Sequence, residues 1–241
     1  MPWVASLSTI AEAAAAGKAL VDAKVPLHAL VLNAGIMAVP ERRVTADNLE
    51  MMMAVNHVAH AALARAAHPA LTAASACEKP RLVVVSSAAH QAASPSFVDS
   101  PVLEGSSYGP WATYGDSKMA NILFARGAAQ HWPDVTSVSL HPGAILTNLS
   151  RHTDGVSAAA FDLLVTLRDY NVHLFKTVSQ GAATTLYALI APEVAGLSGA
   201  YFENAHQAQP SALYMDAAKA EYASTLWSTT WKVVDKVLAK K

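Results

Sequence analysis

Cysteine is almost absent from this 241-residue sequence, which contains only Cys77. A lone cysteine cannot form a disulfide within the chain and has no partner for a Cys-x-x-Cys metal or redox site. The first residues also lack a basic segment followed by an apolar stretch, so no signal peptide is predicted. We therefore expect a protein of a reducing compartment, the cytoplasm, without a disulfide framework.

Charge and long apolar runs are scarce as well. Charged residues make up 15% of the chain and the formal net charge is -1, so no basic surface for nucleic acid is predicted. Hydrophobic residues make up 53%, which argues against disorder. Charges or prolines interrupt each apolar stretch before about 18 residues accumulate, so no membrane-spanning helix is expected. The length suits one α/β domain over residues 1–241.

A tyrosine and a lysine one helical turn apart are the most informative residues that are present. Tyr114 and Lys118 are separated by four positions in a segment with helical apolar spacing, so they share one helix face. A phenol has a pKa of about 10 when unperturbed, and a neighbouring cation lowers that pKa by favouring the phenolate. The pair therefore predicts a proton donor and acceptor that works near neutral pH.

A buried strand is predicted upstream, over residues 81–85, and it ends in Ser86 and Ser87. Parallel α/β sheets place their ligand contacts beyond the carboxyl ends of strands. A serine at this position could hold a carbonyl oxygen of a substrate, and either serine of the pair could do so. We regard Ser87 as the better candidate, for the reason given next.

The order of several motifs resembles the short-chain dehydrogenase/reductase family, most closely its retinol-dehydrogenase-like branch. The resemblance extends from about residue 5 to residue 237, and Ser87 is the serine that matches the family position. The motifs that carry it are Leu32-Asn33-Ala34-Gly35-Ile36-Met37, Val55-Asn56-His57, Val84-Val85-Ser86-Ser87, Tyr114 to Lys118 with Asn121-Ile122-Leu123-Phe124, His141-Pro142-Gly143 and Gly199-Ala200-Tyr201-Phe202.

The resemblance implies a Rossmann-like, doubly wound parallel sheet and an NAD(P)-dependent oxidoreductase that interconverts an alcohol and a ketone or aldehyde. Tyr114 would exchange a proton with the substrate oxygen, and Ser87 would hydrogen-bond that oxygen. Lys118 would lower the pKa of the tyrosine and hold a ribose hydroxyl of the nicotinamide. Asn56 would anchor a water molecule that leads to the lysine.

The resemblance also implies contacts with NAD or NADP. Asn33, Ala34 and Gly35 would lie against the adenosine ribose, although a plain strand-ending turn explains the same residues. Thr147 would meet the nicotinamide carboxamide, and the alternative is that it caps the next helix. The full set of implied cofactor contacts is Asn33, Ala34, Gly35, Tyr114, Lys118, Pro142, Gly143 and Thr147.

The glycine-rich turn on which this family builds its dinucleotide site is missing from the sequence. No G-x-G-x-x-G spacing follows a strand, and Trp3 stands where the family has an aspartate that contacts adenine. We expect an N-terminally truncated domain with weakened cofactor binding, whose strand around Leu30 is an exposed apolar edge. The alternative function is therefore a non-catalytic scaffold or interaction protein that cannot bind the dinucleotide.

Two helical segments leave further alternatives open. Residues 45–74 are predicted to form one or two helices. From Met51 onward their pattern is apolar nearly all round, which fits either a homodimer contact or burial within the chain. Residues 150–177 carry an apolar face, which fits either a lid over a small lipophilic alcohol or carbonyl substrate or ordinary helix packing. Further helices are predicted over residues 6–22, 111–131, 180–190 and 214–238, and further strands over residues 29–32, 135–140 and 199–202.

Three histidines share the long helical stretch, namely His57, His60 and His68. Only His57 and His60 lie close together on one face, and no acidic residue stands at ligand spacing. A metal site is therefore not expected.

Overall fold

The computed structural model describes residues 4–74, 78–99, 108–145, 175–210 and 221–240. Its main sheet has the order β1-β2-β3-β6-β7, in which the first four strands run parallel and β7 pairs antiparallel with β6. The strands are β1 (Ala29–Leu32), β2 (Arg81–Val85), β3 (Thr136–His141), β6 (Tyr201–Glu203) and β7 (His206–Ala208). This is the Rossmann-like α/β fold that the sequence predicted.

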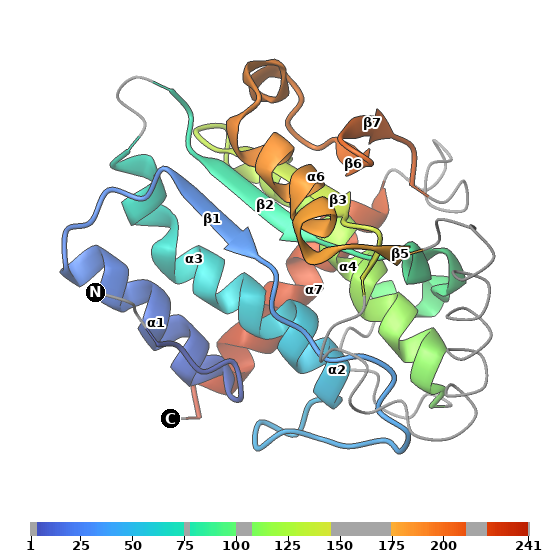
Figure 1. Cartoon of the computed structure of the whole chain (residues 1–241). Coiled ribbons are helices and arrows are strands. Elements are labelled where there is room, and N and C mark those ends of the chain that lie inside the picture. The colour runs from blue at the N-terminus through green and yellow to red at the C-terminus, as the bar shows by residue number, and fades with distance from the viewer. Residues whose placement is uncertain (1–3, 75–77, 100–107, 146–174, 211–220, 241) are drawn as a thin grey trace.

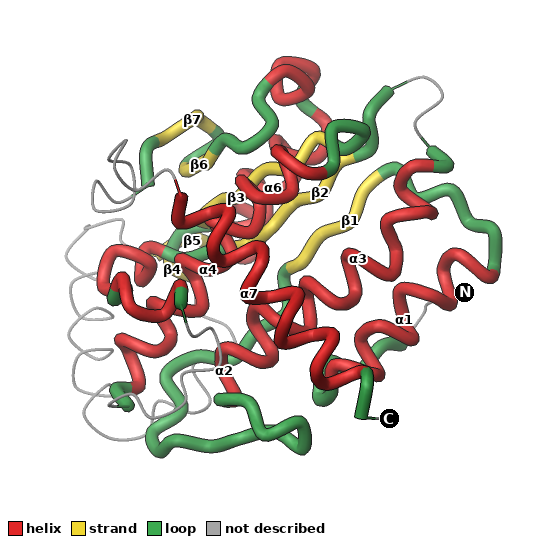
Figure 2. Tube along the Cα trace, turned by 180° about the vertical axis from the view of Figure 1, so that it is seen from behind, coloured by secondary structure: helices red, strands yellow, loops and turns green. Residues whose placement is uncertain are grey.

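Helices cover both faces of the sheet. Helix α6 (Val178–Ile190) lies in front of β2 and β3 in Figure 1, whereas α3 (Ala59–Thr72) and α4 (Pro110–His131) lie behind. Helix α1 (Ile10–Asp22) packs on α3, and α7 (Glu221–Leu238) packs on α4, as Figure 2 shows from the other side. The sheet is therefore doubly wound, as expected for parallel strands, which are buried on both faces.

Local sequence signals explain where α1 and α6 begin. Thr9 caps α1 and forms a capping box with Glu12, so the helix predicted from residue 6 begins at Ile10. Thr177 and Gln180 form the same box at the start of α6. Each box satisfies backbone N–H groups that have no partner within the helix, so each fixes the first turn.

The apolar pattern of α3 and α4 is satisfied within the chain. Helix α1 covers α3, and α7 brings Trp227 and Trp231 onto Phe124 of α4, with ring centroids 5.5 and 6.0 Å apart. Trp132 completes this aromatic cluster, 5.2 Å from Trp227. Burial within the chain, one of the two alternatives from the sequence, therefore accounts for these helix faces.

The helical segment predicted over residues 45–74, as one or two helices, starts later than predicted. It begins only at α2 (Met51–Met53), because the Glu50 carboxylate caps that end by accepting hydrogen bonds from the N–H groups of Met52 and Met53. A π-helical turn, η1 (Ala54–Val58), follows before α3 starts. Such turns occur mostly at functional sites, and no sequence signal predicted this one.

Short elements line the carboxyl end of the sheet. Two 3-10 turns, η2 (Ala88–Ala92) and η3 (Pro95–Val98), lie in the connection after β2. A third, η5 (Pro192–Gly196), follows α6 and lies at the opposite end, where the carbonyl of Ala195 accepts from the hydroxyl of Thr136 at the start of β3. Strands β4 (Ala144–Ile145) and β5 (Phe175–Lys176) form a separate parallel pair that the sequence did not predict. Thr147 and the apolar segment predicted as a lid, apart from residues 175–177, lie outside the described residues.

Strand β1 is the edge of the sheet. Among the described residues it pairs only with β2, and no described helix lies in front of it in Figure 1. Its first three residues are only half buried, whereas β2 is buried throughout. The exposed apolar edge predicted around Leu30 is therefore present in the described part of the chain.

Candidate active site

Tyr114 and Lys118 lie on the second and third turns of α4 (Pro110–His131), on the helix that the sequence predicted. Gly109 caps this helix and Pro110 occupies its first turn, where the missing N–H of proline is harmless. Both side chains are buried, at 3% and 4% exposure. The Nζ atom of Lys118 lies 5.7 Å from the centroid of the Tyr114 ring, over its face.

The two serines after β2 have different partners. Ser86 is buried and donates its hydroxyl hydrogen bond to the carbonyl of Lys118 at 2.7 Å. Ser87 is half buried, and its hydroxyl acts on the side chain of Tyr114, whose pKa it lowers. Ser86 therefore joins the strand to the helix backbone, and Ser87 is the serine that meets the phenol.

Lys118 is a buried cation with little to neutralise it. Its Nζ atom donates to the carbonyl of Val85 at 3.2 Å, and the amide of Asn121 donates to the same carbonyl at 3.0 Å. Among the described residues it forms no ion pair with a carboxylate. Burial therefore lowers the pKa of Lys118 from its usual 10.5 to about 8.

The pKa of the Tyr114 phenol differs from the value predicted from the sequence. Burial raises the pKa of Tyr114 from 10 to about 12, and the hydrogen bond from Ser87 opposes that rise. Lys118, whose Nζ atom lies 5.7 Å from the ring centroid, does not offset this rise. Desolvation of the phenolate is the larger effect here.

Asn56 joins three segments instead of standing free. Its side-chain oxygen accepts from the N–H of Ile36 at 2.9 Å, and its amide donates to the carbonyl of Ile36 at 2.9 Å and to Ser117 Oγ at 3.0 Å. Its own carbonyl pairs with Nδ1 of His60 at 3.0 Å. The loop after β1 is thereby tied to α4 through Asn56, a role that the sequence did not reveal for Ser117 or His60.

The predicted cofactor contacts lie at the ends of two strands. Asn33 and Ala34 are exposed beyond β1, and Gly35 lies against Asn56 and Lys118. A Cβ atom at Gly35 would stand 3.0 Å from Oδ1 of Asn56 and 3.6 Å from Nζ of Lys118. Glycine therefore permits close approach at this point.

Pro142 and Gly143 follow β3 on the same side of the sheet. Gly143 has a φ angle of +98°, which glycine adopts without strain. Its Cα atom packs against the side chain of Lys176, whose Nζ atom donates to the carbonyl of Pro142 at 3.2 Å. Lys176 is a charged neighbour of the predicted cofactor contacts that sequence reasoning missed.

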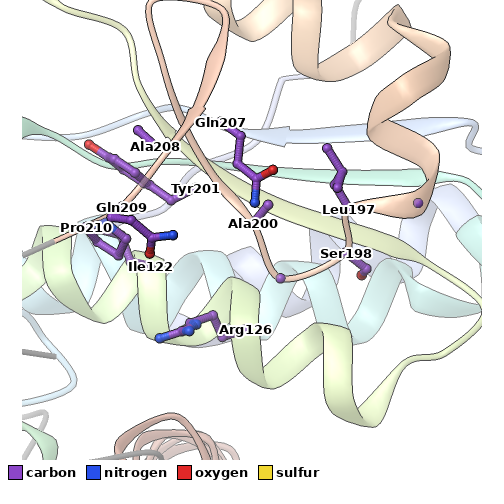
Figure 3. Close-up of a pocket in the computed structure, with 12 residues that line it drawn as sticks. Ile122, Arg126, Leu197, Ser198, Ala200, Tyr201, Gln207, Ala208, Gln209 and Pro210 are labelled. Carbon is purple, nitrogen blue, oxygen red and sulfur yellow. The ribbon is translucent and has the colours of Figure 1, made fainter. Parts of the chain in front are cut away.

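A separate pocket of about 310 Å³ lies between α4 and the β6–β7 hairpin (Figure 3). Arg126, Tyr201 and Gln207 are among its lining residues. Twelve residues separate Tyr114 from Arg126 on α4, about 18 Å at the rise of an α-helix. The pocket is therefore distinct from the tetrad.

Metal and membrane sites were also sought in the described ranges. No group of three or more His, Cys, Asp and Glu side chains there is placed to hold a metal ion. No helix there combines the length and apolar composition of a bilayer span.

Comparison with known proteins identifies relatives over most of the chain. The sequence profile of the short chain dehydrogenase family matches residues 1–155. "Probable oxidoreductase" of Streptomyces lividans is 40% identical over 212 residues, which cover 84% of this chain and 70% of that protein. Polyprenol dehydrogenase of Homo sapiens is 35% identical over 186 residues, which cover 75% of this chain and 54% of that protein.

A solved structure shares the fold. NADPH-bound carbonyl reductase from chicken fatty liver superposes with a TM-score of 0.53 at 21% identity, covering 83% of this chain and 73% of that one. Together with the sequence relatives and the family profile, this likeness agrees with the sheet order described above. The chain belongs to the short-chain dehydrogenase family of oxidoreductases.

Proposed function

We propose that this protein is an NAD(P)-dependent oxidoreductase that interconverts an alcohol and a ketone or aldehyde through Tyr114, Lys118, Ser87 and Asn56. The observation that carries the proposal is that Ser87 and Lys118 both stand beside the buried Tyr114: the Ser87 hydroxyl lowers the pKa of the phenol, and Nζ of Lys118 lies 5.7 Å from the ring centroid. A carbonyl oxygen that meets both hydroxyls would be polarised and protonated in one place.

Each member of the tetrad then has a separate task. Tyr114 gives its proton to the substrate oxygen during reduction and takes it back during oxidation. Ser87 hydrogen-bonds that oxygen and holds it at the phenol. Lys118, a cation 5.7 Å from the ring, favours the phenolate once a bound substrate and cofactor change the surroundings of the site. Asn56 keeps the loop of Gly35 on α4.

The chain's residues fit the nicotinamide end of the cofactor. Lys118 has N–H groups beyond the one bonded to Val85, and they suit ribose hydroxyls. Gly35 lets a ligand approach Lys118 and Asn56 closely. Asn33, Ala34, Pro142, Gly143 and, outside the described residues, Thr147 complete the proposed contacts. The nicotinamide, when bound, supplies or accepts the hydride.

The pyrophosphate end of the cofactor would find fewer contacts in this chain. The 241 residues contain no glycine-rich turn between a strand and a helix. The N-terminus of α1 is already taken, since its first N–H donates to the Asp47 carboxylate at 2.7 Å. We therefore expect weak dinucleotide binding by this chain. A non-catalytic scaffold or interaction protein is the second candidate function, and the same deficit supports it.

A lipophilic substrate fits the surroundings of Tyr114. Its neighbours are mainly apolar and include Ile36, Met37 and Val39. Trp111 lies 6.3 Å from its ring and is 49% exposed, so it offers an apolar surface at the entrance. The name of the human polyprenol dehydrogenase is in line with a lipophilic alcohol, as is a place in the retinol-dehydrogenase-like branch.

Two further properties are part of the proposal. We propose one domain over residues 1–241 in the cytoplasm, as the single cysteine suggests. A homodimer, if it forms, would use a surface other than the faces of α3 and α4 that are covered within the chain.

Cofactor binding separates the two candidate functions. Titration calorimetry of the purified chain with NADPH and with NADH would give micromolar dissociation constants for an oxidoreductase. Absence of binding at millimolar cofactor would defeat the enzymatic proposal for this chain. The scaffold proposal would be defeated by micromolar binding together with turnover.

The Tyr114→Phe variant tests the chemistry. General acid catalysis contributes about 10²- to 10⁴-fold, so we expect that loss in NADPH-dependent reduction of octanal, with the cofactor dissociation constant unchanged within about twofold. Tyr187→Phe is the control, because Tyr187 bonds to Glu193 on the surface. An equal loss in both variants would contradict the role of Tyr114.

A further inference from the structure

Two histidines hold the backbone of the turn that carries Ser87. This turn, η2, begins directly after β2, and the Ser87 hydroxyl caps it by accepting from the N–H of Ala89 at 3.2 Å. His90 lies within the turn, and His141 reaches it from the end of β3. The catalytic tetrad described above includes neither histidine.

His90 holds the carbonyl of Ser87. Its Nδ1 atom lies 2.6 Å from that oxygen, which also accepts from the N–H of His90 at 3.1 Å. A carbonyl only accepts hydrogen bonds, so the proton of the imidazole sits on Nδ1. The ring is buried at 2% exposure and packs edge-on against Tyr201, with centroids 5.4 Å apart. His90 is thus held on both sides.

His141 holds the other end of the same peptide group, in the opposite sense. The N–H of Ala88 donates to its Nδ1 atom at 3.2 Å. A backbone N–H only donates, so this Nδ1 carries no proton and the neutral ring is protonated on Nε2. Burial lowers the pKa of His141 to about 4, with the nearby cations Lys176 and Lys118 acting in the same direction. The acceptor is therefore available at neutral pH.

Helix α4 presses on the same turn from a third side. A Cβ atom at Gly115 would lie 2.6 Å from the carbonyl oxygen of Ala89, so only glycine allows this approach. One residue later, the Asp116 carboxylate accepts from the N–H of Ser94 at 2.7 Å. The turn is therefore fixed relative to the helix that carries Tyr114.

We propose that His90 and His141 are positioning residues. As opposite tautomers, they hold the two ends of the Ser87–Ala88 peptide group and so aim the Ser87 hydroxyl at Tyr114. His90 donates to the carbonyl oxygen of this peptide bond, and His141 accepts from its N–H. The pair acts on the substrate only through Ser87. This inference rests on the proposed function for its catalytic consequence, but its geometry can be tested without turnover.

The tautomers can be read directly by long-range ¹H–¹⁵N NMR of the protein labelled at histidine. We expect the Nδ1–H form for His90 and the Nε2–H form for His141 at pH 7. In His141→Leu, amide exchange at Ala88 and Ala89 should accelerate by about tenfold relative to Val84, and His141→Asn, whose Oδ1 can accept, should restore it. Charged rings or exchanged tautomers would overturn the proposal whether or not the protein turns over a substrate.

Turnover tests the consequence. A misplacement of about 1 Å at a reacting centre costs about 100-fold, so kcat for octanal reduction by NADPH should fall about that much in His141→Leu and in His90→Phe, which keeps the ring against Tyr201. The KM for NADPH should change less than about twofold, and His141→Asn should recover most of the rate. His68→Leu, which removes a histidine stacked on Trp132, is the control and should keep the wild-type kcat.

A double-mutant cycle separates positioning from general damage. In the Ser87→Ala background, His141→Leu should lower kcat by less than about twofold further, because the residue it positions is gone. Additive losses would overturn the proposal. Absence of any turnover in the wild type would instead defeat the proposed function, and the NMR and exchange results would still decide the positions of the two histidines.

Discussion

Among the single residues of the site, Lys118 is the one whose charge is hardest to accommodate. Its ammonium is 4% exposed, and the only hydrogen bond it makes within the described residues is to the carbonyl of Val85. Burial lowers its pKa from 10.5 to about 8, so the folded protein binds this proton less tightly than the unfolded chain. A buried cation of this kind reduces stability at neutral pH in return for a charge beside Tyr114.

Replacement of this charge gives a prediction with a defined pH window. A shift from 10.5 to about 8 corresponds to about 3 kcal/mol, so Lys118→Met should raise the free energy of unfolding by up to that amount below pH 8. The unfolded wild type binds more protons between pH 8 and 10.5, so wild-type stability recovers as the pH rises, and the advantage of the variant should disappear near pH 10.5. Urea denaturation at several pH values measures it.

The control for this prediction is Lys18→Met. Lys18 is exposed on α1 and pairs with Asp22, four residues along. Its replacement should change stability little at any of these pH values. A constant difference between Lys118→Met and wild type from pH 7 to 10.5 would show that the buried charge is not the cause.

Sequence motifs located the candidate residues of the site but did not predict the pKa of Tyr114. Tyr114, Lys118, Ser87 and Asn56 were identified from their motifs, and the structure brings all of them to the carboxyl end of the sheet. The pKa of Tyr114 was expected to be lowered, and it is raised to about 12. Spacing along a helix places two groups near each other, but it carries no information about how much water each retains.

At the scale of elements, the contact between η2 and α4 decides where Ser87 stands. Alanine at position 115 would place a Cβ 2.6 Å from the carbonyl oxygen of Ala89, which is backbone and cannot swing away. The glycine in the middle of a good helix is explained by this approach. Glycine destabilises the helix by about 1 kcal/mol relative to alanine, and in exchange the turn can approach the helix closely.

Gly115→Ala should therefore destabilise the protein in spite of the better helix propensity of alanine. Overpacking typically costs about 1–3 kcal/mol, which we expect to exceed the gain in propensity, and urea denaturation would measure the net loss. Gly196→Ala is the matched change, because a Cβ atom there would meet no atom within 4 Å. Equal stability of the two variants would contradict the close approach.

Element boundaries were predictable where the signal was local. The capping box of α1 and the apolar run of β1 placed both elements at their observed positions. The π-helical turn at Ala54–Val58 and the pairing of β4 with β5 were not predicted. Both depend on partners far away in the sequence, such as Ile36 for Asn56.

At the scale of the whole molecule, the free side of β1 is the main irregularity. Its backbone pairs only with β2 among the described residues, and its side chains are apolar. Val31 packs on the face that carries α6, yet no described helix lies in front of β1 there. An unpaired apolar edge can pair with another strand, which promotes association.

Val31→Lys should weaken self-association of the purified chain. A charge at the edge opposes strand pairing, and we expect the association constant from sedimentation velocity to fall about tenfold, equivalent to about 1.4 kcal/mol. Val178→Lys is the control, because Val178 is 70% exposed on α6 and away from that edge. If both changes reduce association equally, general apolar exposure and not the edge drives it.

The sequence by itself determined the fold class and the family and supplied the candidate residues of the tetrad, because strand periodicity, caps and short motifs are written in neighbouring residues. Only the tertiary structure decided which serine meets Tyr114, that Asn56 is bound to Ile36 and Ser117, and that two histidines flank Ser87. These are contacts between segments far apart in the chain. Burial and hydrogen-bond partners, which set both pKa values and positions, exist only once those segments have packed together.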